Sequence, residues 1–448
     1  MNVRAELATL ARLAWPIASA QMLLVSMGLV DTAVLGRVSV DELAGATIGR
    51  SIGFGAASLC MGIGMGLEPL ASQALGAGEV GRAWGALLAT LKAIALSWIP
   101  VAIAAMGVTY LLEPGGVDHA IVVRARAYLI GQLPGLGLYG VFIAARTYLQ
   151  AQGNARPALV AALVANLMNW LVCNLLVRGD AALHALGLPG IGLPPLGAFG
   201  AGMATSLAEI VLVSITLRAA RVRHGTTVTE HVPVSTALRV GVPVGMQLFA
   251  EMGIFALVAL VSGRLGPVSA SAHQVAIGLA SFTYMASIGV STATAVRVGN
   301  AIGEGTSPRR VGLTGIALGG GLQVIGAVVF AVVPRGLVGI FTPDPEVLAL
   351  GAQLVLIAAV FQLFDGVQGV ASGALRGAGD VRFAFLANVA AYWVIGLPVA
   401  LWLGFVAHMG ARGLWWGMTT GLVIVSFVLV GRFVVLTRGK ILRIEKRG

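Results

Sequence analysis

The sequence predicts an all-α integral membrane protein, and three observations lead to that fold class. Of the 448 residues, 58% are hydrophobic and only 10% are charged, and the mean hydropathy is +0.92. A water-soluble domain carries about 25% charged residues. Apolar segments of about 20 residues, long enough to span a bilayer, recur along the chain. Because these segments are continuously apolar rather than alternating, they predict helices and not the strands of a closed barrel.

Twelve spans are predicted, joined by short connections rich in Gly, Pro and charge. They cover residues 8–35, 46–73, 83–111, 122–149, 157–178, 195–220, 238–263, 268–298, 311–340, 348–374, 384–407 and 410–436. One of the longer connections, residues 221–237, is hydrophilic and falls at the midpoint of the chain. We therefore predict an N-lobe of six helices (1–222), a cytoplasmic linker (223–237) and a C-lobe of six helices (238–448).

The positive charges predict how the chain is oriented. Of the 29 Lys and Arg, 20 fall on the side that holds the N-terminus, eight fall on the other side, and Lys92 lies within a span. Because cytoplasmic loops carry the excess of Lys and Arg, both termini are predicted to be cytoplasmic. The first segment faintly resembles a secretory signal, but Arg12 interrupts its apolar run, so a retained first span is expected.

The two halves of the sequence repeat one another. A shift of 227 residues brings Pro16 onto Pro243 and Arg37 onto Arg264. With six spans in each half, both halves enter the membrane from the same side, as parallel repeats related by a pseudo-two-fold axis along the membrane normal. Such repeats are typical of secondary transporters. The alternative is a duplicated scaffold that transports nothing.

Five acidic side chains fall inside predicted spans, namely Asp31, Glu68, Glu209, Glu251 and Asp365. A charge at the bilayer centre costs roughly 2.5–3.5 kcal/mol, so such residues usually face a cavity and are functional. Burial favours the protonated form of a carboxyl group, as a proton-coupled carrier requires, whereas the ionised oxygens could hold Na⁺. We predict a functional role for Asp31, Glu251 and Asp365. For Glu68 and Glu209, a structural role at the interface or in an ion pair is at least as well supported.

Two prolines occupy the repeat-matched first and seventh spans, Pro16 and Pro243. Proline inside a helix removes a backbone hydrogen bond and kinks the helix. The kink could be passive. The alternative interpretation is a bend that opens and closes a cavity beside Asp31 and Glu251.

Four stretches of the sequence resemble one transporter family, the multidrug and toxic compound extrusion (MATE) family, over essentially the full chain. They are "LAWPIASAQMLLVSMGLVDTAVLGRVSVDELAG", "PLASQALGAGEVGRA", "VRVGNAIGEG" and "LRGAGDVRFAFLANVAAYWVIGLPVAL". The resemblance implies two six-helix lobes around a central cavity, and export of cationic amphipathic drugs in exchange for H⁺ or Na⁺. It also implies a monomer in the bacterial inner membrane that needs no cofactor.

The acidic residues resemble those of the NorM-like members of the family. Glu251 in the seventh span and Asp365 in the tenth match the acidic pair of that subgroup, and Asp31 matches the N-lobe acid. The polar partners of that acid carry over to Tyr139, Asn169 and Thr205.

Two departures from the family pattern concern the coupling ion. Cys173 stands where many members place an acidic or amide residue, and Phe361 stands where some NorM-like carriers place a Tyr. Each departure removes an oxygen from a potential Na⁺ site. Both therefore favour H⁺, with a Na⁺ site at Glu251 and Asp365 as the alternative.

Other functions fit the sequence less well. A lipid-linked precursor flippase would need a cationic cavity for pyrophosphate, yet Lys92 is the main basic residue placed mid-membrane. An enzyme is not expected, because the six His are scattered and form no metal-ligand pattern. The absence of a Walker A motif argues against ATP as the energy source. The net charge of +11 is not arranged in a basic patch with aromatic residues, so nucleic acid is not an expected partner.

Overall fold

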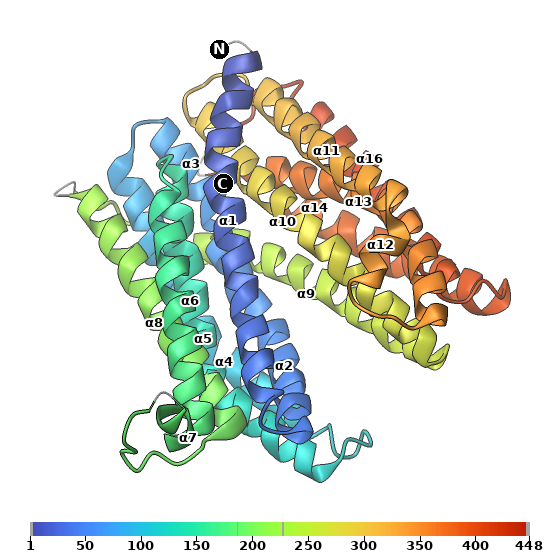
Figure 1. The fold of residues 1–448 in the computed structure, drawn as a ribbon. Coiled ribbons are helices and arrows are strands. Elements are labelled where there is room, and N and C mark those ends of the chain that lie inside the picture. Colours follow the sequence, from blue (N-terminus) through green and yellow to red (C-terminus); the bar gives the residue numbers. More distant parts are fainter. Residues whose placement is uncertain (1–2, 186, 226–227, 445–448) are drawn as a thin grey trace. The chain divides into compact units, whose positions relative to one another are not determined.

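The computed structural model describes residues 3–185, 187–225 and 228–444, and within these ranges the ordered elements are helices (Figure 1). The chain forms two compact units. Unit 1 holds Met1–Ala18, Glu68–Glu79 and Gln247–Gly448, and unit 2 holds Ser19–Leu67 and Val80–Met246. The chain passes between the units at four places, after Ala18 and Met246 inside two long helices and after Leu67 and Glu79, and none of these lies in the predicted linker. That linker includes residues 226–227, which lie outside the described residues, and the predicted lobe boundaries stay a prediction.

Twelve helical segments among the described residues are long and apolar enough to cross a membrane, as the sequence predicts. Their bounds differ from the predicted ones by a few residues in most cases. The largest difference is at the ninth span, which ends at Val332 and not at residue 340. Pro334 begins a separate short helix there, and the residue before it, Val333, has φ −127° and ψ 43°. A proline disfavours the helical conformation in the residue that precedes it, so the span ends early.

Unit 2 contains most of the first six spans. Its elements are the later part of α1 (Val3–Leu35), α2 (Val40–Met65), α4 (Val80–Thr109), α5 (His119–Ala151), α6 (Arg156–Arg178), α7 (Asp180–His184), α8 (Gly197–His224) and the first part of α9 (Val234–Arg264). Helix α5 packs closely against α2 and α8. A Cβ on Gly49 of α2 would lie 2.6 Å from the backbone oxygen of Ala125, and one on Gly202 of α8 would collide with the backbone of Tyr128. Small residues at these contacts let helices approach each other inside a membrane.

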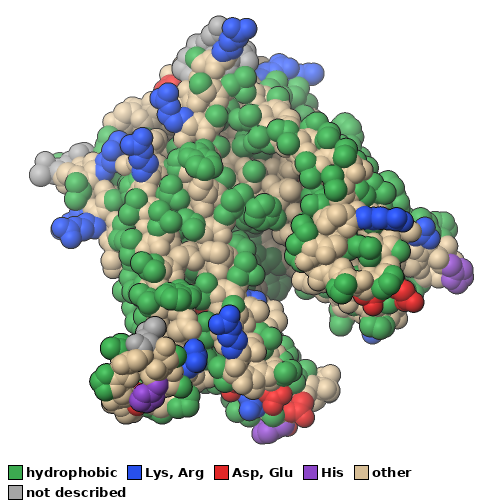
Figure 2. Space-filling model, viewed as in Figure 1, with side chains coloured by type: hydrophobic (Ala, Val, Ile, Leu, Met, Phe, Trp, Pro, Cys, Tyr) green, Lys and Arg blue, Asp and Glu red, His purple; other side chains and the backbone are tan. Residues whose placement is uncertain are grey.

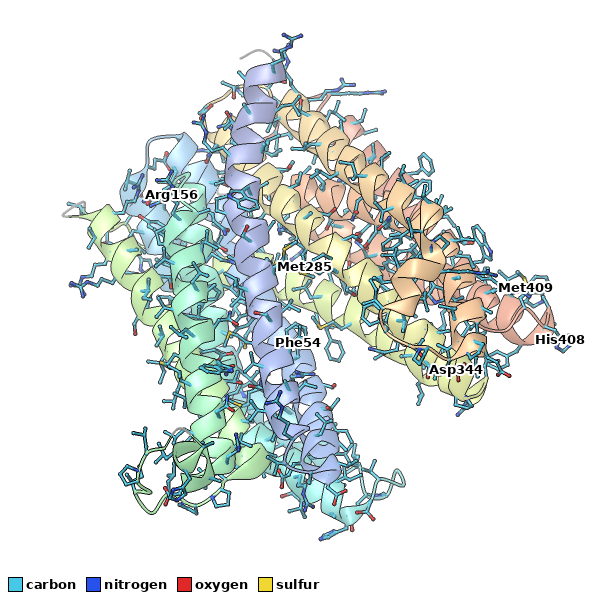
Figure 3. All side chains as sticks on the ribbon, in the orientation of Figure 1. Phe54, Arg156, Met285, Asp344, His408 and Met409 are labelled. Atoms are coloured by element: carbon cyan, nitrogen blue, oxygen red, sulfur yellow. The ribbon has the colours of Figure 1, made fainter. Side chains whose placement is uncertain are left out.

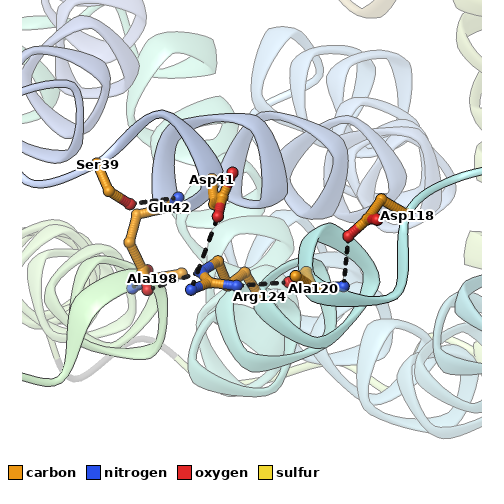
Figure 4. Close-up of polar contacts among 7 residues, drawn as sticks. All are labelled: Ser39, Asp41, Glu42, Asp118, Ala120, Arg124 and Ala198. Carbon is orange, nitrogen blue, oxygen red and sulfur yellow. Dashed lines mark hydrogen bonds and ion pairs between the residues drawn. The ribbon is translucent and has the colours of Figure 1, made fainter.

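One carboxylate joins three helix starts at an end of unit 2. Glu42 of α2 accepts a hydrogen bond at Oε1 from Nε of Arg124 in α5, at 3.1 Å, and another at Oε2 from the backbone N–H of Ala198 in α8, at 2.6 Å (Figure 4). Ser39 caps α2 by accepting from the Glu42 N–H at 3.0 Å. The first turn of a helix leaves backbone N–H groups without intrahelical partners, so Glu42 satisfies one of these in α8 and fixes α2, α5 and α8 relative to one another.

Unit 1 contains the remaining spans. Its elements are the first part of α1, α3 (Leu67–Gly76), the later part of α9, α10 (Pro267–Gly303), α11 (Pro308–Val332), α12 (Pro334–Gly339), α13 (Pro345–Gly377), α14 (Val381–Val389), η1 (Ala390–Gly396), α15 (Leu397–Leu401), η2 (Trp402–Val406) and α16 (Ala411–Leu436). Helix α13 packs against α10 through glycines. A Cβ on Gly373 would lie 2.5 Å from the backbone oxygen of Ser291.

The eleventh span contains two π-helical segments, η1 and η2. The backbone N–H of Leu397 bonds to the oxygen of Tyr392, and that of Ala407 to the oxygen of Trp402, each five residues back. Single π-helical turns inside α-helices occur frequently at functional sites. The segment η1 carries Tyr392, which interacts with the charges of two acidic residues described below, and Trp393, whose indole N–H donates to the backbone oxygen of Ala250 at 3.1 Å.

The surface has the distribution that a membrane protein requires. On the face that Figure 2 shows, hydrophobic side chains cover the flanks of the helices, and most charged side chains lie near helix ends. Asp344, labelled in Figure 3, lies at the exposed start of α13. It accepts hydrogen bonds from the N–H groups of Glu346 and Val347 at 2.9 and 3.0 Å. His408, in the turn between η2 and α16, has φ 55°. Large apolar side chains such as Leu167, 61% exposed, lie mid-span, where lipid and not water is the expected surrounding.

Candidate functional site

Asp31 lies in α1 inside unit 2, where neutral donors surround its carboxylate. The side chain is 3% exposed. Its Oδ2 accepts hydrogen bonds from Oγ1 of Thr205 at 2.9 Å and from the hydroxyl of Tyr128 at 3.1 Å. Its Oδ1 lies 3.5 Å from Nδ2 of Asn169. The partners come from α5, α6 and α8, so four helices of unit 2 converge on one carboxylate.

Two of the three predicted partners of Asp31 are at this site. Asn169 and Thr205 lie beside the carboxylate, as predicted. Tyr139 makes no hydrogen bond to Asp31 within the described part of the chain; its ring instead lies 6.0 Å from that of Phe142, centroid to centroid. The tyrosine that does donate is Tyr128, eleven residues earlier in α5.

An arginine within the predicted span 46–73 lies in the same small pocket as Asp31. Arg50 of α2 lines this pocket together with Asp31 and Tyr128. Its guanidinium donates to the backbone oxygen of Gly28 at 2.5 Å and to Oγ1 of Thr32 at 3.3 Å. Because α2 begins at Val40 and not near residue 46, Arg50 is already well inside the helix. The site therefore combines a carboxylate with a nearby cation that does not bond to it directly.

A second carboxylate, Glu209, lies one turn from Thr205 on the same face of α8. It is 6% exposed, and its Oε2 has no hydrogen-bond partner among the described residues. That oxygen lies against Gly135 of α5, where a Cβ would collide with it. The ion pair considered for Glu209 is not found among the residues that the structure describes. The absent side chain at Gly135 leaves the space that this carboxylate occupies.

Glu251 of α9 is the centre of a polar cluster in unit 1. Its Oε1 accepts hydrogen bonds from the amide nitrogen of Gln247 at 3.0 Å and from that of Gln368 at 3.3 Å. Gln247 also donates to Ser372 at 3.1 Å, and Gln368 to Asn388 at 2.7 Å. All of these partners are neutral. The cluster joins α9, α13 and α14, whose Asn388 lies two residues before the π-helical segment η1.

Asp365 lies on α13 close enough to Glu251 for the two charges to interact. The hydroxyl of Tyr284 lies near this part of α13, since a Cβ on Gly369 would be 2.9 Å from it. Tyr392 of η1 is 3% exposed and also interacts with the charges of both acids. Unit 1 thus brings the predicted Glu251–Asp365 pair together, next to two tyrosine hydroxyl groups.

Glu68 does not reach the interface, the structural role considered for it. Its side chain is 1% exposed and forms an ion pair with Arg376 of α13, whose side chain is 9% exposed. Glu6 and Arg297 form another ion pair in unit 1, at 3.0 Å. Among the described residues, no group of three or more His, Cys, Asp and Glu is placed to hold a metal ion.

Both predicted helix-bending prolines lie inside helices. Pro16 is within α1 and Pro243 within α9. Helix α1 passes from one compact unit to the other after Ala18, and α9 does so after Met246. Each proline therefore comes within three residues of such a boundary (18 − 16 = 2 and 246 − 243 = 3). Whether either helix bends there during function stays a prediction.

The MatE family model matches residues 16–175 of the chain and matches it again at residues 243–402. The chain belongs to the MatE family. The two matches are offset by the same distance at both ends (243 − 16 = 402 − 175 = 227), which confirms the predicted repeat.

Curated relatives and solved structures extend over nearly the whole MatE chain. It is 34% identical to the "Probable multidrug resistance protein NorM" of Deinococcus radiodurans, covering 98% of this chain and 97% of the relative. It is 33% identical to the protein of the same name from Pseudomonas putida, covering 96% and 94%. The fold matches the eukaryotic MATE transporter AtDTX14 with a TM-score of 0.85 at 21% identity, covering 97% and 96%. It also matches the bent form of the Vibrio cholerae MATE transporter VcmN, with a TM-score of 0.82 at 18% identity, covering 97% and 98%. These likenesses confirm the NorM-like resemblance and the all-α, two-lobe fold class.

Proposed function

We propose that this MatE protein is a secondary transporter that exports cationic amphipathic compounds in exchange for H⁺. The names of its curated relatives support multidrug export. One observation supports the coupling mechanism. The side chains that donate hydrogen bonds to the carboxylates of Asp31 and Glu251 are all uncharged. A proton can therefore bind to either carboxylate without first breaking an ion pair.

The hydroxyl donors at Asp31 suit a group that gains and loses a proton. Hydrogen bonds from Thr205 and Tyr128 stabilise the ionised carboxylate. When Asp31 is protonated, it can donate to a hydroxyl oxygen, because Ser, Thr and Tyr hydroxyl groups both donate and accept. The same partners thus serve both protonation states, and the change of hydrogen-bond direction links protonation to the packing of α1 against α5 and α8.

The surroundings of the acids support H⁺ over Na⁺ as the coupling ion. Oε1 of Glu251 already accepts two amide hydrogen bonds, which oppose the approach of a cation to that oxygen. The ring of Phe361 packs between two others, with its centroid 5.7 Å from that of Trp415 and 6.4 Å from that of Phe255, and Phe361 supplies no oxygen. Hard cations such as Na⁺ prefer several oxygen ligands, and Cys173 beside Asp31 supplies sulfur instead.

We propose that the protein lies in a bacterial inner membrane as a monomer with both termini in the cytoplasm. In this arrangement the excess of Lys and Arg lies on the cytoplasmic side. The residues assigned to coupling are Asp31, Glu251 and Asp365. The protein needs no cofactor and catalyses no chemical step.

Dye transport in inside-out vesicles tests this function. A pH gradient alone should drive accumulation of a lipophilic cationic dye, whereas a Na⁺ gradient alone should not. Asp31→Asn and Asp365→Asn should each abolish transport, while Glu346→Gln, at an exposed acid on the same helix as Asp365, should leave it unchanged. Transport driven only by Na⁺ would overturn the choice of ion. Full dye transport in both Asp variants would overturn the proposed antiport mechanism.

A further inference from the structure

An open groove in unit 1 lies outside the acidic cluster. It encloses about 510 Å³ between the end of α9 and the π-helical end of the eleventh span. Its lining residues are Val261, Arg264, Leu401, Trp402, Phe405 and Val406. A volume of this size is within the range of about 300–1,000 Å³ that small-molecule sites show.

The groove combines apolar walls with a single charge. Trp402 is 58% exposed and Val406 is 63% exposed, so the walls are apolar surface left open by the protein. Arg264 is exposed and makes no side-chain hydrogen bond or ion pair among the described residues. Its guanidinium offers five N–H donors in a planar fork that matches phosphate. A lipophilic cation would be repelled by this charge, which separates the groove from the sites that the proposed export uses.

The position of the groove identifies its surroundings. Its two walls come from the last residues of two membrane-spanning segments, Val234–Arg264 and Val381–Val406. The ends of such segments lie at the level of lipid headgroups, where Trp is enriched. A basic residue at this level lies beside phosphate groups, and the apolar walls next to it lie beside acyl chains.

The π-helical turn contributes to the shape of the groove. In η2 the N–H of Ala407 bonds to the oxygen of Trp402, five residues back, where an α-helix would use the residue four back. This wider turn carries Trp402, Phe405 and Val406, all of which line the groove. The distortion of the span therefore coincides with the lining residues.

We infer that this groove binds one anionic glycerophospholipid of the membrane. Its phosphate is held by the Arg264 guanidinium, and the first part of an acyl chain lies on Trp402 and Phe405. Charge complementarity favours a lipid with net negative charge over a zwitterionic one, whose amine would lie close to the guanidinium. The inference concerns the lipid alone and does not depend on the coupling ion or on the exported compound.

Native mass spectrometry of the full-length protein tests this inference. The protein is released from nanodiscs that contain equal amounts of phosphatidylglycerol and phosphatidylcholine, and the lipids that remain bound are counted. We expect one retained phosphatidylglycerol per chain. Arg264→Gln should lower its retention about tenfold, a magnitude typical of a lost hydrogen bond to a charged group. Arg264→Lys should restore part of it, because Lys keeps the charge without the planar fork.

The internal repeat supplies a matched control. Arg37 is the equivalent of Arg264 at a shift of 227 residues, is exposed, and does not line the groove. Arg37→Gln should leave phosphatidylglycerol retention unchanged. Equal losses in the two variants would show nonspecific attraction of lipid to positive charge and would overturn the inference. Equal retention of both lipids by the wild-type protein would also overturn the inference. So would a result in which Arg264→Gln removes a dimer but leaves lipid retention unchanged, because Arg264 would then contact a second chain.

Discussion

Arg376 of α13 donates a hydrogen bond from Nε to Oε2 of Glu68 in α3, and the resulting ion pair is buried inside unit 1. The two residues are 308 positions apart in the chain. Gln73 strengthens the same contact, because its amide nitrogen donates to the backbone oxygen of Gly377 at 3.0 Å. Helix α3 is thereby fixed to α13, although it follows α2 of unit 2 directly in the sequence.

Arg376→Met should destabilise the protein by about 3–5 kcal/mol, because Glu68 would lose its buried cation. The double variant Glu68→Leu/Arg376→Met should recover most of the stability, since replacing both charges removes the cost of desolvating either. Thermal unfolding in detergent, followed by tryptophan fluorescence, measures both effects. Arg382→Met, at an exposed site in the next helix, is the control. A double variant no more stable than Arg376→Met would show that the pair is not the source of the loss.

Tyr128 and Tyr139 should respond differently to removal of their hydroxyl groups. Tyr128→Phe removes a hydrogen bond to the Asp31 carboxylate. A hydrogen bond to a charged group contributes about 1.5–3 kcal/mol, so proton-driven dye transport should fall by about tenfold or more. Tyr139→Phe should have little effect, because Tyr139 does not bond to Asp31 within the described structure. Initial transport rates at equal protein density compare the two, and a larger loss in Tyr139→Phe would contradict the observed geometry.

Sequence periodicity could not distinguish these two tyrosines. Eleven residues separate them on α5, and eleven residues at 100° each make about three full turns, so both lie on one face of the helix. They differ instead in depth, by about 16 Å along the helix axis. The depth of Asp31 relative to α5 depends on how α1 packs in unit 2, and this packing is not contained in the sequence of either helix.

The twelve spans, in contrast, could be predicted from sequence because lipid leaves few alternatives. A backbone without water must form its own hydrogen bonds, so each long apolar segment becomes a helix of nearly determined length. The Glu68–Arg376 pair is the opposite case. Glu68 and Arg376 each lie near the end of a predicted span, so each is expected to be a charge at the membrane interface. The break between α2 and α3 instead lets Glu68 contact Arg376 of α13.

Gln368 should be needed to hold Glu251 in place. It donates to Oε1 of Glu251 and to Asn388, so Gln368→Leu removes one of two donors to the carboxylate and leaves Asn388 with an unsatisfied buried oxygen. We expect dye transport to fall several-fold, with the protein still folded. Gln323→Leu is the control, because Gln323 is also buried, on α11, and does not bond to Glu251. Equal losses in the two variants would indicate a general cost of replacing buried amides and not a role at Glu251.

Asp180 should make the loop between α7 and α8 sensitive to acid. Its carboxylate accepts hydrogen bonds from the backbone N–H groups of Ile191, Gly192 and Leu193 at 3.1, 2.9 and 3.0 Å. These bonds, the one from Leu193 foremost, lower the pKa of Asp180. A lowered pKa means that the stabilisation is present above the unfolded value of about 3.9 and is lost as the pH falls through the folded value.

The loop should therefore remain closed from neutral pH down to about pH 4, near the unfolded pKa, and open below it. Hydrogen exchange at the amides of residues 191–193, corrected for the intrinsic effect of pH, measures this opening. Asp180→Asn keeps only one acceptor oxygen, so these amides should exchange faster at neutral pH. Asp118→Asn, at the cap of α5, should leave them unchanged. Exchange that is equally slow in Asp180→Asn and in the wild-type protein would show that the carboxylate does not hold the loop.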